Sequence, residues 1–325
     1  MKTAVAQISS YLGNLEKNVD KHLEYCDRAI KEKADIIVFP ELSLTGYTLK
    51  DINYEICINP YTSAKLDKLR EVSKKISIIC GLVEEGENSA VYNSAAYIED
   101  GEVKFTHRKV YPPTYGIFEE LRYFTPGQTC KTYNTKHGKI GILVCEDLWH
   151  LSLPLTQSLD GALVIFGIAA SPTKVGADMT DLLTDTTSLE IGILEHVYKT
   201  CGVKYNSFKE FMESITADSD EIVKIKNYYV NSDHHKTYAR LLSLFIVFCN
   251  RVGYEDGVNF WGGSEVVNPF GKVQTLAKFI DEDLIFSEID LSEITRARRL
   301  AGHFFDENIN LTIQNLVKVR DKEHK

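Results

Sequence analysis

Short runs of apolar, β-branched residues alternate with stretches of helical periodicity along much of this chain, and this alternation limits the possible folds more than any other feature. Four runs have the pattern of strands that are buried on both faces, at residues 35–39, 76–80, 140–144 and 161–166. Such runs are typical of the central strands of a sheet in an α/β protein.

The first helix of this pattern is predicted between a strand at about residues 3–9 and the strand at 35–39. Asn14 can cap its start, and its apolar residues recur at helical spacing. These are Leu15, Val19, Leu23, Cys26 and Ile30. The chain therefore begins with a strand–helix–strand unit.

Other segments have the pattern of β-hairpins. Residues 90–98 and 102–109 flank an Asp100-Gly101 turn, and residues 263–267 and 273–277 flank a turn at Gly271. Parallel units and hairpins in one chain predict a mixed sheet, or two sheets packed on each other with helices outside.

The alternation stops between residues 176 and 236, where helical spacing appears at 182–198 and 208–229 without a strand pattern. We expect an all-helical insertion there. Residues 292–325 are charged and helix-like and predict a C-terminal helical tail, which leaves residues 1–291 as the main domain.

Composition excludes several classes of protein. Hydrophobic residues make up 44% and charged residues 26%, and the net charge is -9, so the chain is globular and has no overall basic field for nucleic acid or an anionic membrane. The apolar stretch at 241–249 is too short to span a bilayer. The start of the chain becomes polar too early for a secretion signal, so we expect a cytoplasmic protein.

The seven cysteines are odd in number and form no C-x-x-C pair. This pattern does not favour a disulfide framework or a zinc ribbon, so we expect reduced thiols. His234 and His235 are adjacent but have no third ligand at metal spacing, and we interpret them as solvated surface residues.

Three reactive side chains are predicted at the ends of strands. Glu41 follows the strand at 35–39, Cys145 follows the strand at 140–144, and Lys109 ends the strand at 102–108. Open α/β sheets place their ligand crevice at such ends. A thiol, a carboxylate and an ammonium group there could act as nucleophile, base and oxyanion stabiliser, although each residue alone is more often structural.

The residues around these positions carry a resemblance to the nitrilase, or carbon–nitrogen hydrolase, superfamily. The matching segments are 39–47 (FPELSLTGY), 107–109 (HRK) and 141–147 (GILVCED), in the order of that family. Weaker matches lie at 120–127, 249–253 and 262–271. The resemblance covers residues 2–291 apart from the insertion.

The resemblance implies a four-layer αββα sandwich and a thiol hydrolase that needs no cofactor or metal. It implies that Cys145 is the nucleophile, Glu41 the general base and Lys109 the cation beside the tetrahedral intermediate. Glu120, rather than its neighbour Glu119, matches a supporting glutamate. The backbone N–H of Glu146 would help to stabilise the oxyanion.

Within the superfamily, the motifs are most similar to the glutaminase domain of glutamine-dependent NAD synthetases. That similarity makes Tyr47 and Ser171 candidate substrate contacts, with a packed tyrosine and an ordinary Ser-Pro turn as the alternatives. Two departures weaken a glutaminase assignment. The sequence holds no Ser-Gly-Gly segment of a synthetase, and no arginine lies between Arg122 and Arg240, where Lys174 is the cation near the Ser171 turn.

We therefore expect a free-standing amidase acting on a small linear amide. A glutaminase or an N-carbamoyl amidohydrolase is the alternative, and a catalytically idle binding or scaffold protein is the alternative of another class. Nitrile hydrolysis is less favoured, because Glu-Asp-Leu-Trp follows Cys145 rather than the pattern of the nitrilase branch. Thiol redox chemistry is less favoured, because the cysteine nearest in sequence, Cys130, is too far along the chain to be an obvious resolving cysteine.

Two further expectations concern surfaces. Family members associate through helices outside the sandwich, and the apolar residues within 235–248 suggest a helix that could join subunits in a homo-oligomer. The insertion would leave the sheet after Ser171, near the predicted site, so it could be a lid. A helical pair that packs away from the site or onto another subunit is an equally open interpretation.

Overall fold

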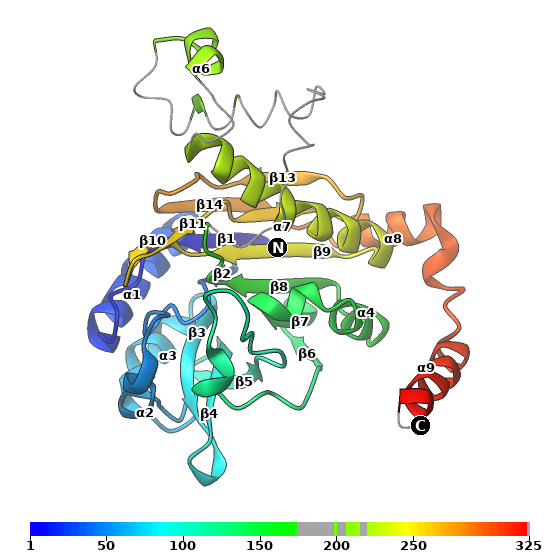
Figure 1. Cartoon of the computed structure of the whole chain (residues 1–325), viewed down its shortest axis with the longest axis horizontal. Coiled ribbons are helices and arrows are strands. Elements are labelled where there is room, and N and C mark those ends of the chain that lie inside the picture. Colours follow the sequence, from blue (N-terminus) through cyan, green and yellow to red (C-terminus); the bar gives the residue numbers. More distant parts are fainter. Residues whose placement is uncertain (174–194, 196–197, 200–205, 215–219, 324–325) are drawn as a thin grey trace.

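Two mixed β-sheets lie at the centre of the protein, seen in a computed structural model that describes residues 1–173, 195, 198–199, 206–214 and 220–323 (Figure 1). Each sheet has six strands. The first has the order β14 (Asp283–Glu288), β1 (Lys2–Gln7), β2 (Ile36–Val38), β3 (Ser77–Glu85), β4 (Val91–Glu99) and β5 (Glu102–Arg108). The second has the order β13 (Val273–Leu276), β12 (Glu265–Val267), β9 (Phe245–Asn250), β8 (Val164–Ala169), β7 (Gly138–Val144) and β6 (Thr132–Thr135).

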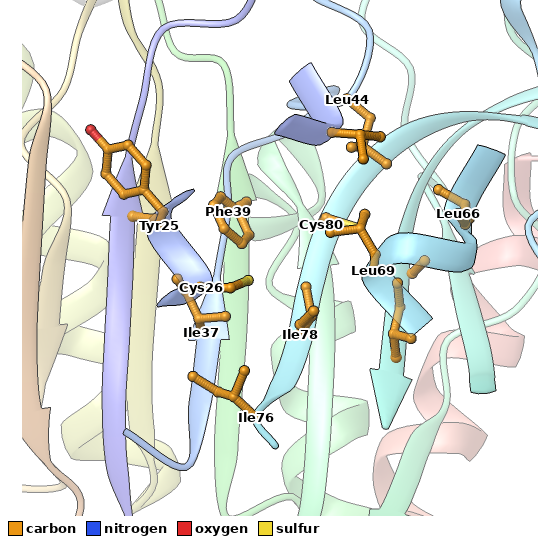
Figure 2. Close-up of a cluster of buried hydrophobic side chains, with 14 of the residues drawn as sticks. Tyr25, Cys26, Ile37, Phe39, Leu44, Leu66, Leu69, Ile76, Ile78 and Cys80 are labelled. Atoms are coloured by element: carbon orange, nitrogen blue, oxygen red, sulfur yellow. The ribbon is translucent and has the colours of Figure 1, made fainter. Parts of the chain in front are cut away.

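The sheets pack face to face through a core that both supply, including Val5, Val38, Ile142 and Phe166, all fully buried. Helices cover the outer faces. Residues of α1 (Leu15–Lys31) and α3 (Asp67–Ser73) pack on the first sheet, and Figure 2 shows that cluster, with Cys26 between Ile37 and Phe39. Residues of α4 (Ser152–Leu159) and α7 (Asp220–Leu242) pack on the second sheet. The predicted αββα sandwich is confirmed.

The local predictions agree with the structure where the signal lies within one segment. Helix α1 begins after Asn14, whose side chain accepts a hydrogen bond from the backbone N–H of Lys17 at 3.0 Å. Both predicted hairpins form, as the antiparallel pairs β4–β5 and β12–β13. Parallel pairing joins β1, β2 and β3, and also β7, β8 and β9.

One stretch differs from the expectation. Residues 235–248 do not form a single helix, because α7 ends at Leu242 and the chain enters β9 at Phe245. Leu244 and Phe245 are fully buried in the sandwich, whereas Leu241 is exposed. The excess of apolar residues therefore reflects a central strand, so this stretch as a whole is not the expected association helix.

The expected insertion at 176–236 is described only in part. The helical pattern at 182–198 lies almost wholly outside the described residues. Further along, α6 (Phe208–Ser214) is followed by α7, which runs past residue 236. The last turns of α7 bury Tyr238, Ala239 and Leu242 against the second sheet, so this part of the chain belongs to the outer layer of the sandwich.

The remaining elements lie around the two sheets. They are α2 (Asn53–Ile56), the two-stranded ribbon β10 (Val252–Glu255) and β11 (Val258–Trp261), α8 (Ser292–Leu300) and α9 (Ile309–Glu323). Figure 1 shows α9 extending away from the sandwich at the C-terminal end. Within the described part of the chain, every helix is too short or too polar to cross a bilayer.

Strand direction brings the predicted site residues to one edge. Strand β3 runs parallel to β2 and antiparallel to β4, which is in turn antiparallel to β5. Strands β2 and β5 therefore end on the same side of the first sheet, where Glu41 and Lys109 follow them. Cys145 follows β7 of the second sheet. The hydrogen bonds described below join this edge of the first sheet to the strand ends of the second.

Candidate active site

Glu41 is a fully buried carboxylate with three hydrogen-bond donors. Its Oε1 accepts from Lys109 Nζ and from Asn93 Nδ2, each at 2.7 Å. Its Oε2 accepts from the backbone N–H of Ala170 at 2.7 Å. Because Ala170 follows β8 of the second sheet, this carboxylate joins the ends of both sheets.

The loop that carries Glu41 lies directly on Gly81 of β3. A Cβ atom at Gly81 would stand 2.2 Å from the backbone N of Leu42 and 2.7 Å from the carbonyl carbon of Glu41. The backbone of Gly81 also accepts a hydrogen bond from Leu44 N at 3.0 Å. Glycine is therefore required at this position for the loop to approach the strand.

Lys109 lies between two carboxylates. Its Nζ is 2.7 Å from Oε1 of Glu41 and 2.7 Å from Oε1 of Glu120, and its side chain is 1% exposed. Burial alone would lower the pKa of Lys109, but the charges of Glu120 and Glu41 outweigh burial and raise this pKa well above its usual value. The lysine therefore remains an ammonium ion throughout the neutral range.

Glu120 completes this buried group of charges, whereas Glu119 is exposed. Tyr47 Oη donates to Oε1 of Glu120 at 2.6 Å. Burial raises the pKa of Glu120, Lys109 opposes that rise, and the nearby charge of Glu41 adds to it. The structure thus places Glu120, of the two neighbouring glutamates, against Lys109.

Cys145 begins a 3₁₀ turn (Cys145–Trp149) directly after β7, and its backbone has a φ of 46°. That conformation is unfavourable for a residue with a Cβ atom and turns the chain sharply at the thiol. Burial raises the pKa of the thiol well above its usual value, Glu41 raises it further, and Lys109 opposes the rise. The resting side chain is therefore a neutral thiol at neutral pH, and it must lose its proton to become a nucleophile.

Sequence reasoning missed Asn93, which donates to both Glu41 and, at 3.4 Å, Glu120. An irregularity between Tyr97 and Ile98 shifts the register of the β4–β5 hairpin by one residue and places Asn93 beside Lys109, whose backbone N–H donates to Asn93 O at 2.8 Å. Regular counting from the predicted turn would have paired Lys109 with Tyr92, so the hairpin pattern alone could not have found this asparagine.

A separate ion pair, between Arg251 and Glu255, holds the Tyr47 loop. Glu255 Oε1 accepts from the backbone N–H groups of Tyr47 and Thr48 at 2.7 and 2.6 Å, and its Oε2 lies 2.9 Å from Nη2 of Arg251. Arg251 is 1% exposed and its guanidinium stacks on Phe260 at 4.3 Å. The ring of Phe260 contacts Tyr47 edge to face. Tyr47 is thereby fixed with its hydroxyl on Glu120.

The other predicted residues lie close to this group. Ser171 follows Ala170, and its backbone N–H donates to Asn250 Oδ1 at 2.8 Å. Glu146 follows Cys145 and accepts from Tyr115 Oη at 2.7 Å. Lys174 lies outside the described residues.

The interpretation of His235 as a solvated surface residue is wrong. It belongs to α7, its side chain is fully buried, and its Nδ1 lies 2.8 Å from Oε1 of the buried Glu265. Its partner Glu265 belongs to β12, which is distant in sequence. The sequence around His235 is polar and does not reveal this partner, so it suggested an exposed residue. Among the described residues, histidine, cysteine, aspartate and glutamate form no cluster that could hold a metal ion.

Comparison with known proteins matches residues 2–219 to the carbon-nitrogen hydrolase family. The glutamine-dependent NAD(+) synthetase of Acinetobacter baylyi is 28% identical over 292 residues, which are 90% of this chain and 44% of the synthetase. The N-carbamoylputrescine amidase of Oryza sativa subsp. japonica is 26% identical over 325 residues, covering 95% of this chain and 93% of the amidase.

A solved structure gives the same result. The glutamine-dependent NAD+ synthetase of Acinetobacter baumannii, determined with adenosine diphosphate, has a TM-score of 0.68 at 27% identity, over 90% of this chain and 46% of that one. The chain therefore spans less than half the length of the synthetases that it matches.

The family match and the αββα sandwich together define the class of this protein as a carbon–nitrogen hydrolase. The chain belongs to the carbon-nitrogen hydrolase family, the nitrilase superfamily, whose members are hydrolases.

Proposed function

We propose that this protein is a cysteine-dependent amidase that hydrolyses a small linear amide to a carboxylic acid and ammonia or an amine. The observation that carries the proposal is the placement of the buried Lys109 ammonium 2.7 Å from both Glu41 and Glu120, where Glu41 also binds the backbone N–H of Ala170 after β8 and Cys145 follows the neighbouring strand β7. A neutral thiol beside a carboxylate and a permanent cation is suited to attack on an amide carbonyl.

The first half of the reaction forms a thioester. Because the resting thiol is neutral, Glu41 accepts its proton as the sulfur attacks the amide carbon. The C=O electron pair moves onto the oxygen, where the Lys109 ammonium and the backbone N–H of Glu146 stabilise the negative charge. When the C–N bond breaks, Glu41 returns the proton to the departing nitrogen, which leaves as ammonia or an amine.

The second half hydrolyses the thioester. Glu41, again a carboxylate, accepts a proton from water as the water oxygen attacks the thioester carbon. The C–S bond then breaks, the carboxylic acid is released, and the proton on Glu41 returns to the sulfur of Cys145. One carboxylate therefore serves as base and acid in both halves.

Glu120 supports this chemistry through Lys109. It supplies a second negative charge that keeps the ammonium protonated and in place, while Tyr47 and Asn93 hold Glu120 and Glu41 by hydrogen bonds. We propose Tyr47 and Ser171 as substrate contacts, because Tyr47 borders the charged group and Ser171 follows the residue that binds Glu41.

Two substrate classes have specific support. The similarity to glutamine-dependent NAD synthetases favours glutamine, and the similarity to an N-carbamoylputrescine amidase over nearly the whole chain favours an N-carbamoyl amine. The absence of an arginine between Arg122 and Arg240 in the sequence removes one carboxylate-binding side chain that a glutaminase would use. We therefore keep a small linear amide as the proposed class.

The test is a panel of glutamine, other ω-amides, simple aliphatic amides and N-carbamoyl amines, with ammonia release as the readout. We expect turnover of at least one member, and Cys145→Ala should reduce it by several orders of magnitude, as loss of a nucleophile does in serine hydrolases. The active amide should also protect Cys145 from iodoacetamide. A Cys145→Ala variant that keeps a tenth of the wild-type rate would refute the assignment, and a folded protein that turns over no amide would favour the idle binding protein.

A further inference from the structure

Asp147 is a fully buried carboxylate that the mechanism above does not use. Four hydrogen bonds reach it. Its Oδ1 accepts from the backbone N–H groups of Val110 at 2.9 Å and Tyr111 at 3.0 Å. Its Oδ2 lies 2.8 Å from His107 Nε2 and accepts from Val144 N–H at 3.1 Å. Because a carboxylate oxygen only accepts hydrogen bonds, Nε2 of His107 is the donor.

These four donors flank the two reactive residues. His107, Val110 and Tyr111 surround Lys109 in the chain, and Val144 immediately precedes Cys145. The first three belong to the end of β5 and the loop after it, in the first sheet, and Val144 ends β7 in the second. One carboxylate therefore connects the backbone that carries the cation to the backbone that carries the thiol.

The connection is rigid on both sides. Asp147 lies in the same 3₁₀ turn as Cys145, and its bond to Val144 N–H closes that turn over the φ of 46° at Cys145. On the other side, Lys109 is held by backbone hydrogen bonds to Asn93 O at 2.8 Å and from Gly127 N at 2.7 Å. His107 is 1% exposed, so its ring has little freedom to leave Asp147.

We propose that Asp147 and His107 are a pair of positioning residues that set the location of the Lys109 ammonium relative to the Cys145 thiol. The proposal rests on the proposed hydrolase function only for its effect on turnover. Its effect on the thiol itself is independent of any substrate, because the charge of Lys109 acts on the thiol in the resting protein.

A purely structural role would predict a different result. Loss of a buried acceptor leaves donors unpaired and costs about 1–3 kcal/mol of stability, but it would leave the reactivity of Cys145 unchanged in protein that remains folded. A positioning role predicts that the thiol loses part of the stabilisation that Lys109 gives to its thiolate. Among the described residues, the groups that act electrostatically on the thiol include Glu41, Lys109, Glu120, Glu146, Tyr47 and Tyr115, and of these Lys109 is the cation.

The experiment measures the rate of Cys145 alkylation by iodoacetamide against pH, by mass spectrometry of the intact protein. Asp147→Asn keeps the size of the side chain but presents an amide NH₂ where one acceptor oxygen stood. We expect the alkylation profile to move to higher pH by about one unit, because a less well placed cation favours the thiolate less. With an active amide, kcat should fall about a hundredfold while KM changes little, as expected when reacting groups are misplaced by about 1 Å.

Glu99→Gln is the matched control. Glu99 is also a buried carboxylate that accepts from a side chain, Tyr97 Oη at 2.7 Å, but it ends β4 at the opposite edge from Asn93. Its alkylation profile should equal that of the wild type. A folded Asp147→Asn variant with the wild-type profile would overturn the proposal, and so would an equal displacement in Glu99→Gln.

A second pair of variants decides the matter if Asp147→Asn fails to fold. His107→Gln retains an N–H donor for Asp147, whereas His107→Leu does not, so the glutamine variant should have a profile closer to that of the wild type. Identical profiles for the two would contradict a positioning role. Because alkylation needs no amide, a displaced profile in a protein that hydrolyses nothing on the panel would reject the proposed function and leave the positioning role in place.

Discussion

Lys109 and Glu120 are buried ionisable residues, and each is stable in the core because the other is charged. A paired buried charge tolerates removal of its partner poorly. In Glu120→Gln, Lys109 loses one of its two carboxylate partners and should pair more strongly with Glu41. The stronger pairing makes the Glu41 carboxylate a weaker proton acceptor. We expect a fall in kcat of about a hundredfold, measured on the amide that the panel identifies.

Glu119→Gln is the control for that change, since the two glutamates are adjacent in sequence and Glu119 is exposed. Its kcat should stay within about twofold of the wild type, because exposed charges contribute little. Equal losses in both variants would show that Glu120 has no particular role.

The opposed effects of Glu41 and Lys109 on the thiol give a second prediction at this scale. The charge of Glu41 raises the pKa of Cys145 and the charge of Lys109 lowers it. Glu41→Gln should therefore speed iodoacetamide alkylation at pH 7 while it abolishes hydrolysis, and Lys109→Ala should slow alkylation at that pH. Alkylation that changes in the same direction in both variants would contradict this assignment of charges.

At the scale of elements, the approach of the Glu41 loop to β3 depends on Gly81. Gly81→Ala places a methyl group 2.2 Å from the backbone N of Leu42, where no flexible side chain can yield. We expect the loop to shift, with a loss of about 1–3 kcal/mol in the free energy of unfolding and a large fall in kcat. Urea unfolding and amide hydrolysis would measure the two effects.

Gly302→Ala is the matched control, because a Cβ atom there meets no described atom within 4 Å. It should leave both quantities unchanged. An active, stable Gly81→Ala protein would show that the loop can move without consequence for Glu41.

Helix α1 holds the same loop through His22, which is fully buried. Its Nδ1 lies 2.7 Å from Asn18 O and its Nε2 2.9 Å from Ser43 Oγ. Burial lowers the pKa of His22 from 6.5 to about 3, against the opposing hydrogen bond to Asn18. Between pH 6.5 and about pH 3, His22 therefore binds a proton in the unfolded chain but not in the folded chain. The contribution of His22 to the free energy of unfolding is full above pH 6.5 and decreases as the pH falls toward 3.

Within that pH range we expect His22 to lower the free energy of unfolding by about 1.4 kcal/mol for each unit by which the pH falls. His22→Gln should be less stable than the wild type at pH 7, but the difference in the free energy of unfolding should narrow as the pH falls to 5. Urea titrations at pH 7, 6 and 5 would check this. Parallel curves for the two proteins would exclude His22 as a source of acid sensitivity.

At the scale of the whole molecule, the C-terminal helix α9 exposes a series of apolar side chains. They are Ile309, Leu311, Ile313, Leu316, Val317 and Val319. A helix of 15 residues with this exposure is marginal by itself in water. We propose that a second copy of the chain covers it, so that the protein is a homo-oligomer. The sequence also led us to expect an oligomer, but one that associates through residues 235–248.

Sedimentation should then give a mass above the 36.8 kDa of one chain at micromolar concentration. Leu316→Asp should shift the protein toward a monomer, whereas Asn315→Asp, which adds the same charge at a polar position of the helix, should not. A strict monomer in the wild type would count against the proposal.

The sequence alone was enough to predict the α/β class, the first helix with its cap and both hairpins. It also predicted that Glu41, Lys109 and Cys145 lie at the ends of strands. These features depend on periodicity, turn residues and motifs within short segments, so their signal is local. Glu120 could be preferred to Glu119 only through the family resemblance, and the structure supplies the physical reason in the burial of Glu120 against Lys109.

Tertiary structure decided the features that depend on partners distant in the chain. Strand β14 pairs with β1, which lies at the other end of the domain in sequence. Residues 245–250 form a central strand, and His235 is buried where it contacts Glu265. The protonation of Cys145 was also open from the sequence, because a thiol beside a cation and a carboxylate could exist in either form. Desolvation decides between them, and desolvation depends on how completely two sheets enclose the site, which no short segment encodes.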